Sequence, residues 1–313
     1  MGSLAQTSQL PVINLSTANL KLGSASWTSV SDRVRNSLEE YGCFVAVYDQ
    51  IPPELQARVF EVMKDLFDLP AEIKAQNVSK TPFHGYIGQK AVIPLHESLG
   101  IERSTTSDSL RNFTNLMWPS GNEFFQETIF SYSNQVAELE QLVVRMVCES
   151  YGVNEYYERR KDTTDYLLRV MKYRGPKENE TSAGLTPHTD KSFLTVLNQN
   201  QVNGLEVKTK DGEWICYQPF PSYFVVMAGD AAMAWSNGRI HSPHHRVTIK
   251  SNNPRYTTGL FSYNQGIIEV PEKLVDAEHP RRFNAFDHYG LTRFFATPAG
   301  QTSPCTATAY CGA

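Results

Sequence analysis

The sequence predicts a mainly β protein with flanking helices, in which a double-stranded β-helix, or jelly roll, forms the core. The main observation is a series of short apolar runs between residues 165 and 263, separated by Gly, Asp, Asn and Pro at near-regular spacing. Such a series is typical of a double-sheet jelly roll or barrel. A second observation is helical periodicity before residue 152, which adds a helical N-terminal region. The 313 residues allow one large domain or two modest ones.

The N-terminal region begins with a short apolar run that predicts a strand at 10–15. Three later segments have apolar residues every three or four positions, which predicts helices. A run without such a period connects the last two of them and contains several Gly, Pro, Ser and Thr residues. A connection this long without regular structure is uncommon, so we expect a binding loop in it. The predicted helices cover 27–41, 53–69 and 122–151, the second strand covers 43–47, and the loop covers 77–121.

The second half of the chain supplies the strands of the predicted jelly roll. Asn203-Gly204 and Lys210-Asp211-Gly212 are favourable hairpin turns between them. The predicted strands cover 165–173, 193–197, 205–209, 213–217, 223–228, 233–236, 246–249 and 256–263. We therefore expect three regions: a helical N-terminal region with a substrate-loop segment at 1–160, the jelly-roll core at 161–268, and a C-terminal segment at 269–313 as a candidate lid.

The composition excludes several classes of function. Lys and Arg number 29 against 33 Asp and Glu, a net charge of −4 without a long basic block, so we expect no nucleic-acid partner. No apolar stretch reaches the length of a membrane span, so we expect no membrane partner. The five cysteines are an odd number without a CxxC pair, which indicates neither a disulfide framework nor a zinc ribbon. We expect a cytoplasmic monomer.

A group of possible metal ligands lies in the strand-rich half. His188 and Asp190 are two residues apart, so in an extended chain both side chains face the same side. A second imidazole is available from His241, His244 or His245. Two His and one carboxylate form a facial triad, which leaves open positions on Fe(II) for oxygen chemistry. A lone His-x-Asp triplet is more often a pair of surface polar residues, and His244 and His245 face opposite sides of a strand, so they cannot both be ligands.

Arg255 lies at the start of the next predicted strand after this histidine cluster. An arginine deep in a barrel can form two parallel hydrogen bonds with one carboxylate. Such an anchor is what a dicarboxylate cosubstrate requires. The triad and the arginine together favour an iron enzyme.

At this point the sequence resembles the plant-type 2-oxoglutarate/Fe(II)-dependent dioxygenases over nearly its whole length. The matching motifs are Leu10-Pro11-Val12-Ile13, Tyr41-Gly42-Cys43-Phe44, His188-Thr189-Asp190, Gly204-Leu205-Glu206-Val207, Ser236-Asn237-Gly238-Arg239 and His245-Arg246-Val247. Other segments are most similar to the subgroup that contains deoxypodophyllotoxin synthase and the glucosinolate dioxygenases. These segments are 115–119, 188–192, 210–214 and 234–239.

The resemblance implies a role for individual residues. The distal histidine of the family precedes Arg-Val, so the resemblance implies that His188, Asp190 and His245 hold Fe(II). It also implies that Arg255, Thr257 and Tyr173 bind 2-oxoglutarate, although Thr257 replaces the usual serine of the family. The implied reaction uses O2, converts 2-oxoglutarate to succinate and CO2, and hydroxylates, cyclises or desaturates a hydrophobic plant metabolite. Assays of such enzymes commonly add ascorbate as reductant.

The sequence identifies residues that contact the substrate less specifically than it identifies the metal ligands. Aromatic and Met side chains are more often plain core, and Lys191 more often pairs with a carboxylate than it guides a substrate. The candidates are Phe113, Met117, Trp118, Lys191, Phe193, Phe261 and Tyr263. Two rival functions share the fold: an iron oxidase that does not use 2-oxoglutarate, and a non-catalytic protein that binds a metal or ligand.

Overall fold

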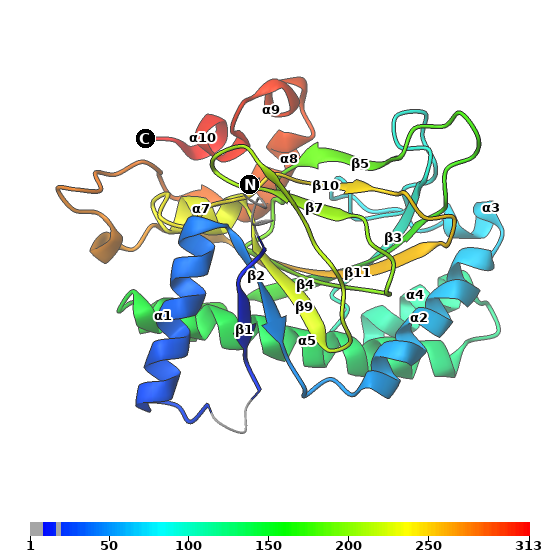
Figure 1. The fold of residues 1–313 in the computed structure, drawn as a ribbon, viewed down its shortest axis with the longest axis horizontal. Helices are drawn as coiled ribbons and strands as arrows, with labels where there is room; N and C mark the ends of the chain where they lie inside the picture. Colours follow the sequence, from blue (N-terminus) through cyan, green and yellow to red (C-terminus); the bar gives the residue numbers. More distant parts are fainter. Residues whose placement is uncertain (1–8, 17–19) are drawn as a thin grey trace, which may run out of the picture.

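The computed structural model describes residues 9–16 and 20–313. Two sheets face each other, and helices cover the outer side of the larger one (Figure 1). The larger sheet has the strand order β1-β2-β9-β6-β11-β4-β3, and the smaller has the order β5-β10-β7-β8. Strands β12 and β13 form a separate pair. The strands are β1 Val12–Asn14, β2 Cys43–Val47, β3 His96–Glu102, β4 Thr164–Tyr173, β5 Ala183–His188, β6 Leu194–Gln199, β7 Leu205–Lys208, β8 Trp214–Cys216, β9 Tyr223–Ala228, β10 His245–Thr248, β11 Arg255–Asn264, β12 Ile267–Ile268 and β13 Phe286–Asp287.

Long helices pack on the outer face of the larger sheet. The hydroxyls of Tyr132 on α5 and Thr258 on β11 lie 2.7 Å apart, which ties the longest helix to the middle of the sheet. Helices α1 and α2 in turn contact α5. The helices are α1 Ala25–Glu40, α2 Pro53–Asp68, α3 Ala71–Lys74, α4 Ser107–Met117, α5 Glu123–Ser150, α6 Asn154–Arg160, α7 Asp230–Trp235, α8 His288–Phe295, α9 Pro298–Thr302 and α10 Thr306–Cys311, with a 3-10 turn η2 at Glu272–Leu274.

Local sequence explains where the main helices begin and end. The side chain of Ser24 accepts a hydrogen bond from the Trp27 amide at 3.2 Å and caps α1, and Asn122 caps α5 in the same way. After α1 the chain turns at Gly42, whose φ of +71° is one that glycine adopts without a steric cost. A Cβ at Gly42 would lie 2.5 Å from the carbonyl oxygen of His241. This close approach packs the turn against the segment that leads into β10.

The inner face of the larger sheet turns toward the smaller sheet and carries a second apolar cluster. Along β11 the side chains alternate, so Tyr256 and Leu260 belong to the outer core under the helices. Met171 and Tyr173 on the neighbouring β4 belong to the inner cluster, together with Leu205 and Val247 of the smaller sheet. The space between the sheets is therefore the interior of the jelly roll.

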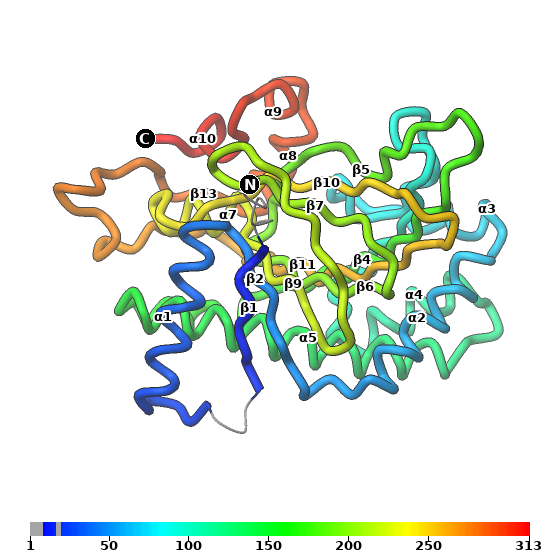
Figure 2. The backbone as a smooth tube through the Cα atoms, viewed as in Figure 1, coloured from blue at the N-terminus to red at the C-terminus, as the bar shows by residue number. Residues whose placement is uncertain are grey.

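The C-terminal segment lies along one end of the sandwich, where the red part of the tube runs close to α7 (Figure 2). Helix α10 contacts α7 and α8, and α8 contacts β11. Among the residues that the structure describes, no helix combines the length and apolar character that a membrane span requires.

Most of the predicted elements are present, and the jelly roll with flanking helices is confirmed. Three predictions are wrong. Residues 233–235 belong to helix α7 and not to a strand, with Ser236 as the C-cap, and the predicted loop at 77–121 contains strand β3 and helix α4. Strand β5 was not predicted from the sequence. Asn203-Gly204 does not form a hairpin, because the chain crosses there from β6 in one sheet to β7 in the other.

Candidate metal centre and cosubstrate site

Three possible metal ligands meet where β5 and β10 pair. His188 lies opposite His245 in the register of the two strands, and their ring centroids are 4.2 Å apart. The Oδ1 atom of Asp190 lies 3.7 Å from Nε2 of His188 and 3.6 Å from Nε2 of His245. One ligand atom from each residue lies within 4.8 Å of the others, a spacing at which one ion can contact all three.

Backbone carbonyls orient both imidazoles. Nδ1 of His188 lies 2.8 Å from the carbonyl oxygen of Thr186, and Nδ1 of His245 lies 3.4 Å from that of Pro243. A carbonyl oxygen only accepts, so each Nδ1 carries the proton and each Nε2 keeps a lone pair directed at Asp190. Metal-binding histidines usually have such a partner on the second nitrogen.

Burial keeps the histidine of β5 neutral. Desolvation, followed by the nearby His245, lowers the pKa of His188 to about 4. A neutral imidazole is the form that binds a metal. The His188 side chain is 28% exposed, whereas those of Asp190 and His245 are 7% and 6% exposed. The cluster is therefore open on the side of His188 and closed on the other side.

Hydrogen bonds from the larger sheet and from α7 hold the carboxylate ligand. The Thr195 hydroxyl donates to Oδ2 of Asp190 at 2.7 Å, which leaves Oδ1 for the ion. The carbonyl oxygen of Asp190 accepts from the amide of Asp230 at 2.8 Å. The Asp230 carboxylate also accepts hydrogen bonds from Nζ of Lys191 at 2.5 Å and from the Ser242 hydroxyl at 2.7 Å. Lys191 therefore pairs with a carboxylate, which was the commoner of the two expectations from the sequence.

A buried arginine lies on the same inner surface. Arg255 begins β11, is 1% exposed, and its NH2 group donates to the Gln199 side chain at 2.6 Å. Within the described part of the chain, its Nε and NH1 groups have no hydrogen-bond partner, and neither has the Thr257 hydroxyl, although all three are buried. Buried polar groups without partners are costly, so these donors fit a carboxylate ligand.

The expected tyrosine is close to this arginine. Tyr173 lies opposite Arg255 in the β4–β11 register, and the Arg255 guanidinium lies 5.0 Å from the centre of its ring. Gly204 lines the other side, where a Cβ would approach Arg255 Cδ to 3.0 Å. The three residues expected at the cosubstrate site are thus brought together.

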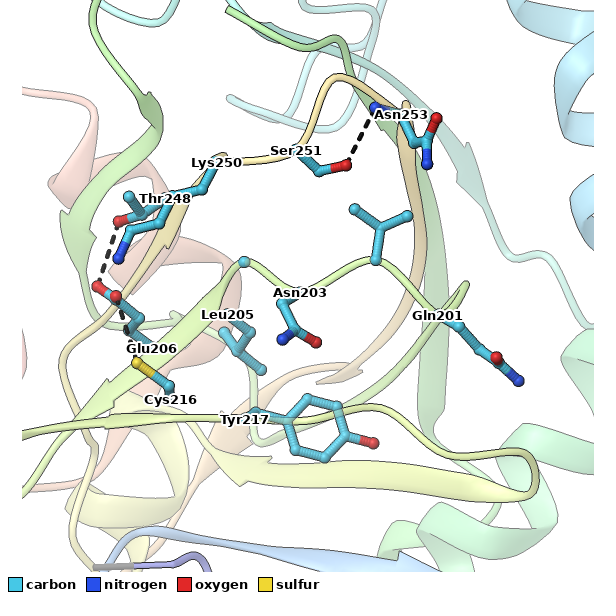
Figure 3. Close-up of a pocket in the computed structure, with 12 residues that line it drawn as sticks. Gln201, Asn203, Leu205, Glu206, Cys216, Tyr217, Thr248, Lys250, Ser251 and Asn253 are labelled. Atoms are coloured by element: carbon cyan, nitrogen blue, oxygen red, sulfur yellow. Dashed lines mark hydrogen bonds between the residues drawn. The ribbon is translucent and has the colours of Figure 1, made fainter. Parts of the chain in front are cut away.

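A cavity of about 470 Å³ lies beyond Gly204, at the edge of the smaller sheet. In Figure 3 the side chains of Thr248 and Cys216 both bond to Glu206 on its wall. None of the three triad residues lines this cavity. It is therefore a separate feature from the metal centre.

The structure places the expected substrate residues in different parts of the molecule. Phe113, Met117 and Trp118 pack in the helical layer outside the larger sheet, where the Trp118 and Phe125 rings are 4.8 Å apart. Phe193 packs against Trp235 in the same outer core. Phe261 and Tyr263 share the face of β11 that carries Arg255 and Thr257. Only these two of the aromatic candidates face the interior of the jelly roll.

Sequence analysis missed several residues that surround the site. The sequence gives no signal for Gln199 or Asp230, and it assigns no role to His96 or His288, which lie outside the predicted histidine cluster. His288 links α8 to the residue after Asp190, because its Nε2 lies 2.9 Å from the carbonyl oxygen of Lys191. No spacing rule could have found them, because each reaches the site from a different element.

The fold and the cluster define the class of protein. A jelly roll with two histidines and one carboxylate between its sheets, and a buried arginine with unpaired donors on the same inner surface, fits a non-haem iron oxygenase that uses a dicarboxylate cosubstrate. The comparisons with known proteins agree. Residues 153–263 match the model of the 2OG-Fe(II) oxygenase superfamily, and residues 10–120 match that of the non-haem dioxygenase in morphine synthesis N-terminal family.

Similar proteins cover almost the whole chain. The "Probable 2-oxoglutarate-dependent dioxygenase AOP1.2" of Arabidopsis thaliana is 46% identical over 94% of this chain and 92% of its own length. A rice "dioxygenase for auxin oxidation" has 29% identity and a TM-score of 0.80, over 97% of this chain and all of that one. The structure of the Arabidopsis "dioxygenase for auxin oxidation 1" in a binary complex with 2-oxoglutarate has 27% identity and a TM-score of 0.76, and the match covers 87% of this chain and 100% of that one. The chain belongs to the 2OG-Fe(II) oxygenase superfamily, and it is a 2-oxoglutarate-dependent dioxygenase that requires iron.

Proposed function

We propose that the protein oxidises a hydrophobic small-molecule plant metabolite, by hydroxylation, ring closure or desaturation. Arabidopsis and rice relatives support a plant metabolite, and two of them are described as acting in auxin oxidation. The apolar and aromatic inner face, with Phe261 and Tyr263 on β11, supports a hydrophobic substrate. The reaction outcome follows from where the substrate radical is held, so the scaffold alone does not set it.

In this proposal His188, Asp190 and His245 hold Fe(II), and Arg255, Thr257 and Tyr173 hold 2-oxoglutarate. The iron and 2-oxoglutarate supply the oxidising power, as O2 is reduced and 2-oxoglutarate is converted to succinate and CO2. The residues of this chain bind and orient the reactants. Asp190 is fixed by Thr195, and the two histidines are fixed by backbone carbonyls, so the ligand set is organised before the metal binds.

The observation that supports the proposal most directly is the set of buried donors without partners beside the triad. Arg255 Nε and NH1 and the Thr257 hydroxyl match the distal carboxylate of a dicarboxylate. An iron oxidase that does not use 2-oxoglutarate would leave these buried donors unpaired. The second candidate function is therefore the weaker one.

The test is incubation of plant extract with the purified protein, Fe(II), ascorbate and 2-oxoglutarate, followed by untargeted mass spectrometry. We expect a metabolite that gains the mass of one oxygen atom or loses that of two hydrogen atoms, together with an equal amount of succinate. A control without 2-oxoglutarate and the variant His188→Ala should both show neither change. Product without succinate would support the oxidase, and binding of Fe(II) and 2-oxoglutarate without oxygen uptake in any fraction would support a non-catalytic protein.

The regions of the chain have separate roles in this proposal. Residues 1–160 supply the outer helices and strands β1, β2 and β3 of the larger sheet, 161–268 carry the iron and cosubstrate residues, and 269–313 act as a lid. The contact that supports a lid is Phe295 of α8, whose ring lies 5.4 Å from that of Phe83 and 4.6 Å from Nζ of Lys191. We expect the protein to act as a monomer.

A further inference from the structure

Arg169 is a buried cation on the inner face of β4 without an acidic partner. It is 8% exposed and lies two residues from Met171 and four from Tyr173, so all three side chains leave the same face of the strand. No carboxylate of the described residues forms an ion pair with it. Arg160, a buried arginine of the outer core, differs, because it contacts Glu140 at 2.8 Å.

Neutral oxygens hold the guanidinium in place but leave its charge uncompensated. NH1 donates to the carbonyl oxygens of Phe83 and Gly85, and NH2 donates to the Ser98 hydroxyl. A guanidinium has five N–H donors, so two remain after these contacts. Desolvation lowers the pKa of Arg169 to about 10, and the groups that oppose this shift are tyrosines, Tyr263 and Tyr173. The side chain therefore stays charged at neutral pH in a site that favours an anion.

The same contacts connect Arg169 to a histidine. The Ser98 hydroxyl accepts from Arg169 and lies 3.0 Å from Nε2 of His96. Burial and then Arg169 lower the pKa of His96 to about 3, so the imidazole is neutral. Its Nδ1 is buried and has no hydrogen-bond partner among the described residues. The row Arg169–Ser98–His96 therefore has unused hydrogen-bonding atoms at both ends.

This row runs from the middle of β4 to the proposed cosubstrate anchor, because His96 lies opposite Tyr173 in the β3–β4 register and their ring centroids are 4.9 Å apart. Along β4 and β11, Arg169 lies opposite Gly259, whereas Arg255 lies opposite Tyr173. Four residues of strand separate the two cations by roughly 13 Å at their backbones, which exceeds the length of a five-carbon diacid.

We propose that Arg169, Ser98 and His96 form a subsite for an anionic group of the substrate, such as a carboxylate. This inference rests on the proposed function and specifies its substrate class: an acid whose apolar part lies against the inner face of β11. The anionic group compensates the buried charge, and it accepts from donors that have no other acceptor. A neutral analogue of the same shape leaves those donors unpaired, which is the basis for strong discrimination.

The test compares carboxylic acids with their methyl esters as ligands. The protein is loaded with Mn(II) and 2-oxoglutarate, and binding of phenylacetate, cinnamate and their methyl esters is measured by ligand-observed NMR and calorimetry. We expect the wild type to prefer each acid at least about tenfold, which corresponds to the loss of a charge-assisted contact. In Arg169→Gln we expect the preference to fall to about twofold or less, and Arg169→Lys should keep part of it.

Arg174→Gln is the matched control, because Arg174 follows the same strand and pairs with Glu180 at 2.6 Å. It should keep the full preference for acids. The inference is overturned if the wild type shows no preference, including no binding of any probe, or if Arg169→Gln keeps it. It is also overturned if Arg169→Gln weakens 2-oxoglutarate binding as strongly as Arg255→Gln, since the cation would then serve the cosubstrate.

Two further measurements distinguish a failure of the subsite from misfolding of a variant and from a failure of the proposed function. If Arg169→Gln does not fold by circular dichroism, the wild-type preference and its reduction in Ser98→Ala decide the matter. Binding is measured in the Mn(II) protein without turnover, so a preference for acids there, combined with no succinate in the separate Fe(II) assay with plant extract, would support the subsite and contradict the proposed function. Turnover of a neutral metabolite by a protein without a preference for acids would support the proposed function and contradict the subsite.

Discussion

Nζ of Lys191 lies 2.5 Å from the Asp230 carboxylate, in a buried ion pair directly beside the metal ligand Asp190. The side chains are 6% and 3% exposed, so neither charge is solvated by bulk water. Asp230 also donates its amide to the carbonyl oxygen of Asp190. The pair therefore connects the turn that carries the metal ligands to helix α7.

Removal of either charge alone should destabilise the protein. We expect Lys191→Met and Asp230→Asn each to lower the free energy of unfolding by about 3–5 kcal/mol, because each leaves an uncompensated buried charge. The double variant should recover part of this loss. Urea unfolding of the metal-free protein measures these values. If the losses of the single variants simply add in the double variant, the two charges are not coupled.

A buried neutral histidine makes the stability depend on pH. The Asn264 amide donates to Nδ1 of His288 at 2.9 Å, so Nε2 carries the proton and donates to the carbonyl oxygen of Lys191. Burial lowers the pKa of His288 from 6.5 to about 3 in the folded protein. Between these values the unfolded chain binds the proton and the folded chain does not, so stability falls as the pH is lowered through this window.

His288→Gln should reduce this pH dependence, because an amide does not titrate. Between pH 6.5 and 5 the wild type should lose about 2 kcal/mol more than the variant, at 1.4 kcal/mol per pH unit. Urea unfolding of both proteins in the presence of a chelator at several pH values is the measurement. Parallel curves for the two proteins would show that His288 does not titrate in this window.

The paired arginine of the outer core should behave as a structural residue. Arg160 donates to Glu140, to the Ser262 hydroxyl and to Asn264, and its guanidinium lies 4.5 Å from the centre of the Phe193 ring. We expect Glu140→Gln to cost about 3–5 kcal/mol of stability, because it leaves this cation buried without its counter-charge. The dissociation constant of 2-oxoglutarate should not change. A calorimetric change in that constant would connect the outer core to the site.

The sequence predicted the elements that have a strong local signal. Helices α1, α2 and α5 have clear apolar periods, and their bounds differ from the prediction by a few residues. Strand β5 was missed because it is an edge strand with exposed residues and a proline, and it lacks the alternating apolar pattern. The short apolar run at 233–235 is compatible with either structure, and only packing against β9 and α10 makes it part of helix α7.

The prediction of the site was limited by tertiary structure in a similar way. Spacing and the resemblance to a family indicated His188, Asp190, His245 and Arg255, and the structure brings the three triad residues to one point. Nothing in the local sequence distinguishes Arg169 from Arg160, since the difference is whether a distant carboxylate meets the guanidinium. The aromatic residues of α4 could not be assigned to a face for the same reason.

Thr257 of the proposed cosubstrate site allows a test in which one substitution weakens 2-oxoglutarate binding but does not lower the stability of the ligand-free protein. The Thr257 hydroxyl is buried without a partner, so it costs stability in the free protein and contributes to binding only when 2-oxoglutarate accepts its proton. Thr257→Val should therefore raise the dissociation constant of 2-oxoglutarate about five- to tenfold, equivalent to about 1–1.5 kcal/mol. The melting temperature of the ligand-free variant should be equal to or above that of the wild type. Thr257→Ser keeps the hydroxyl and should bind within about twofold of the wild type. Calorimetry with Mn(II) and a thermal melt without ligand measure the two effects, and a valine variant that binds 2-oxoglutarate as the wild type does would remove Thr257 from the site.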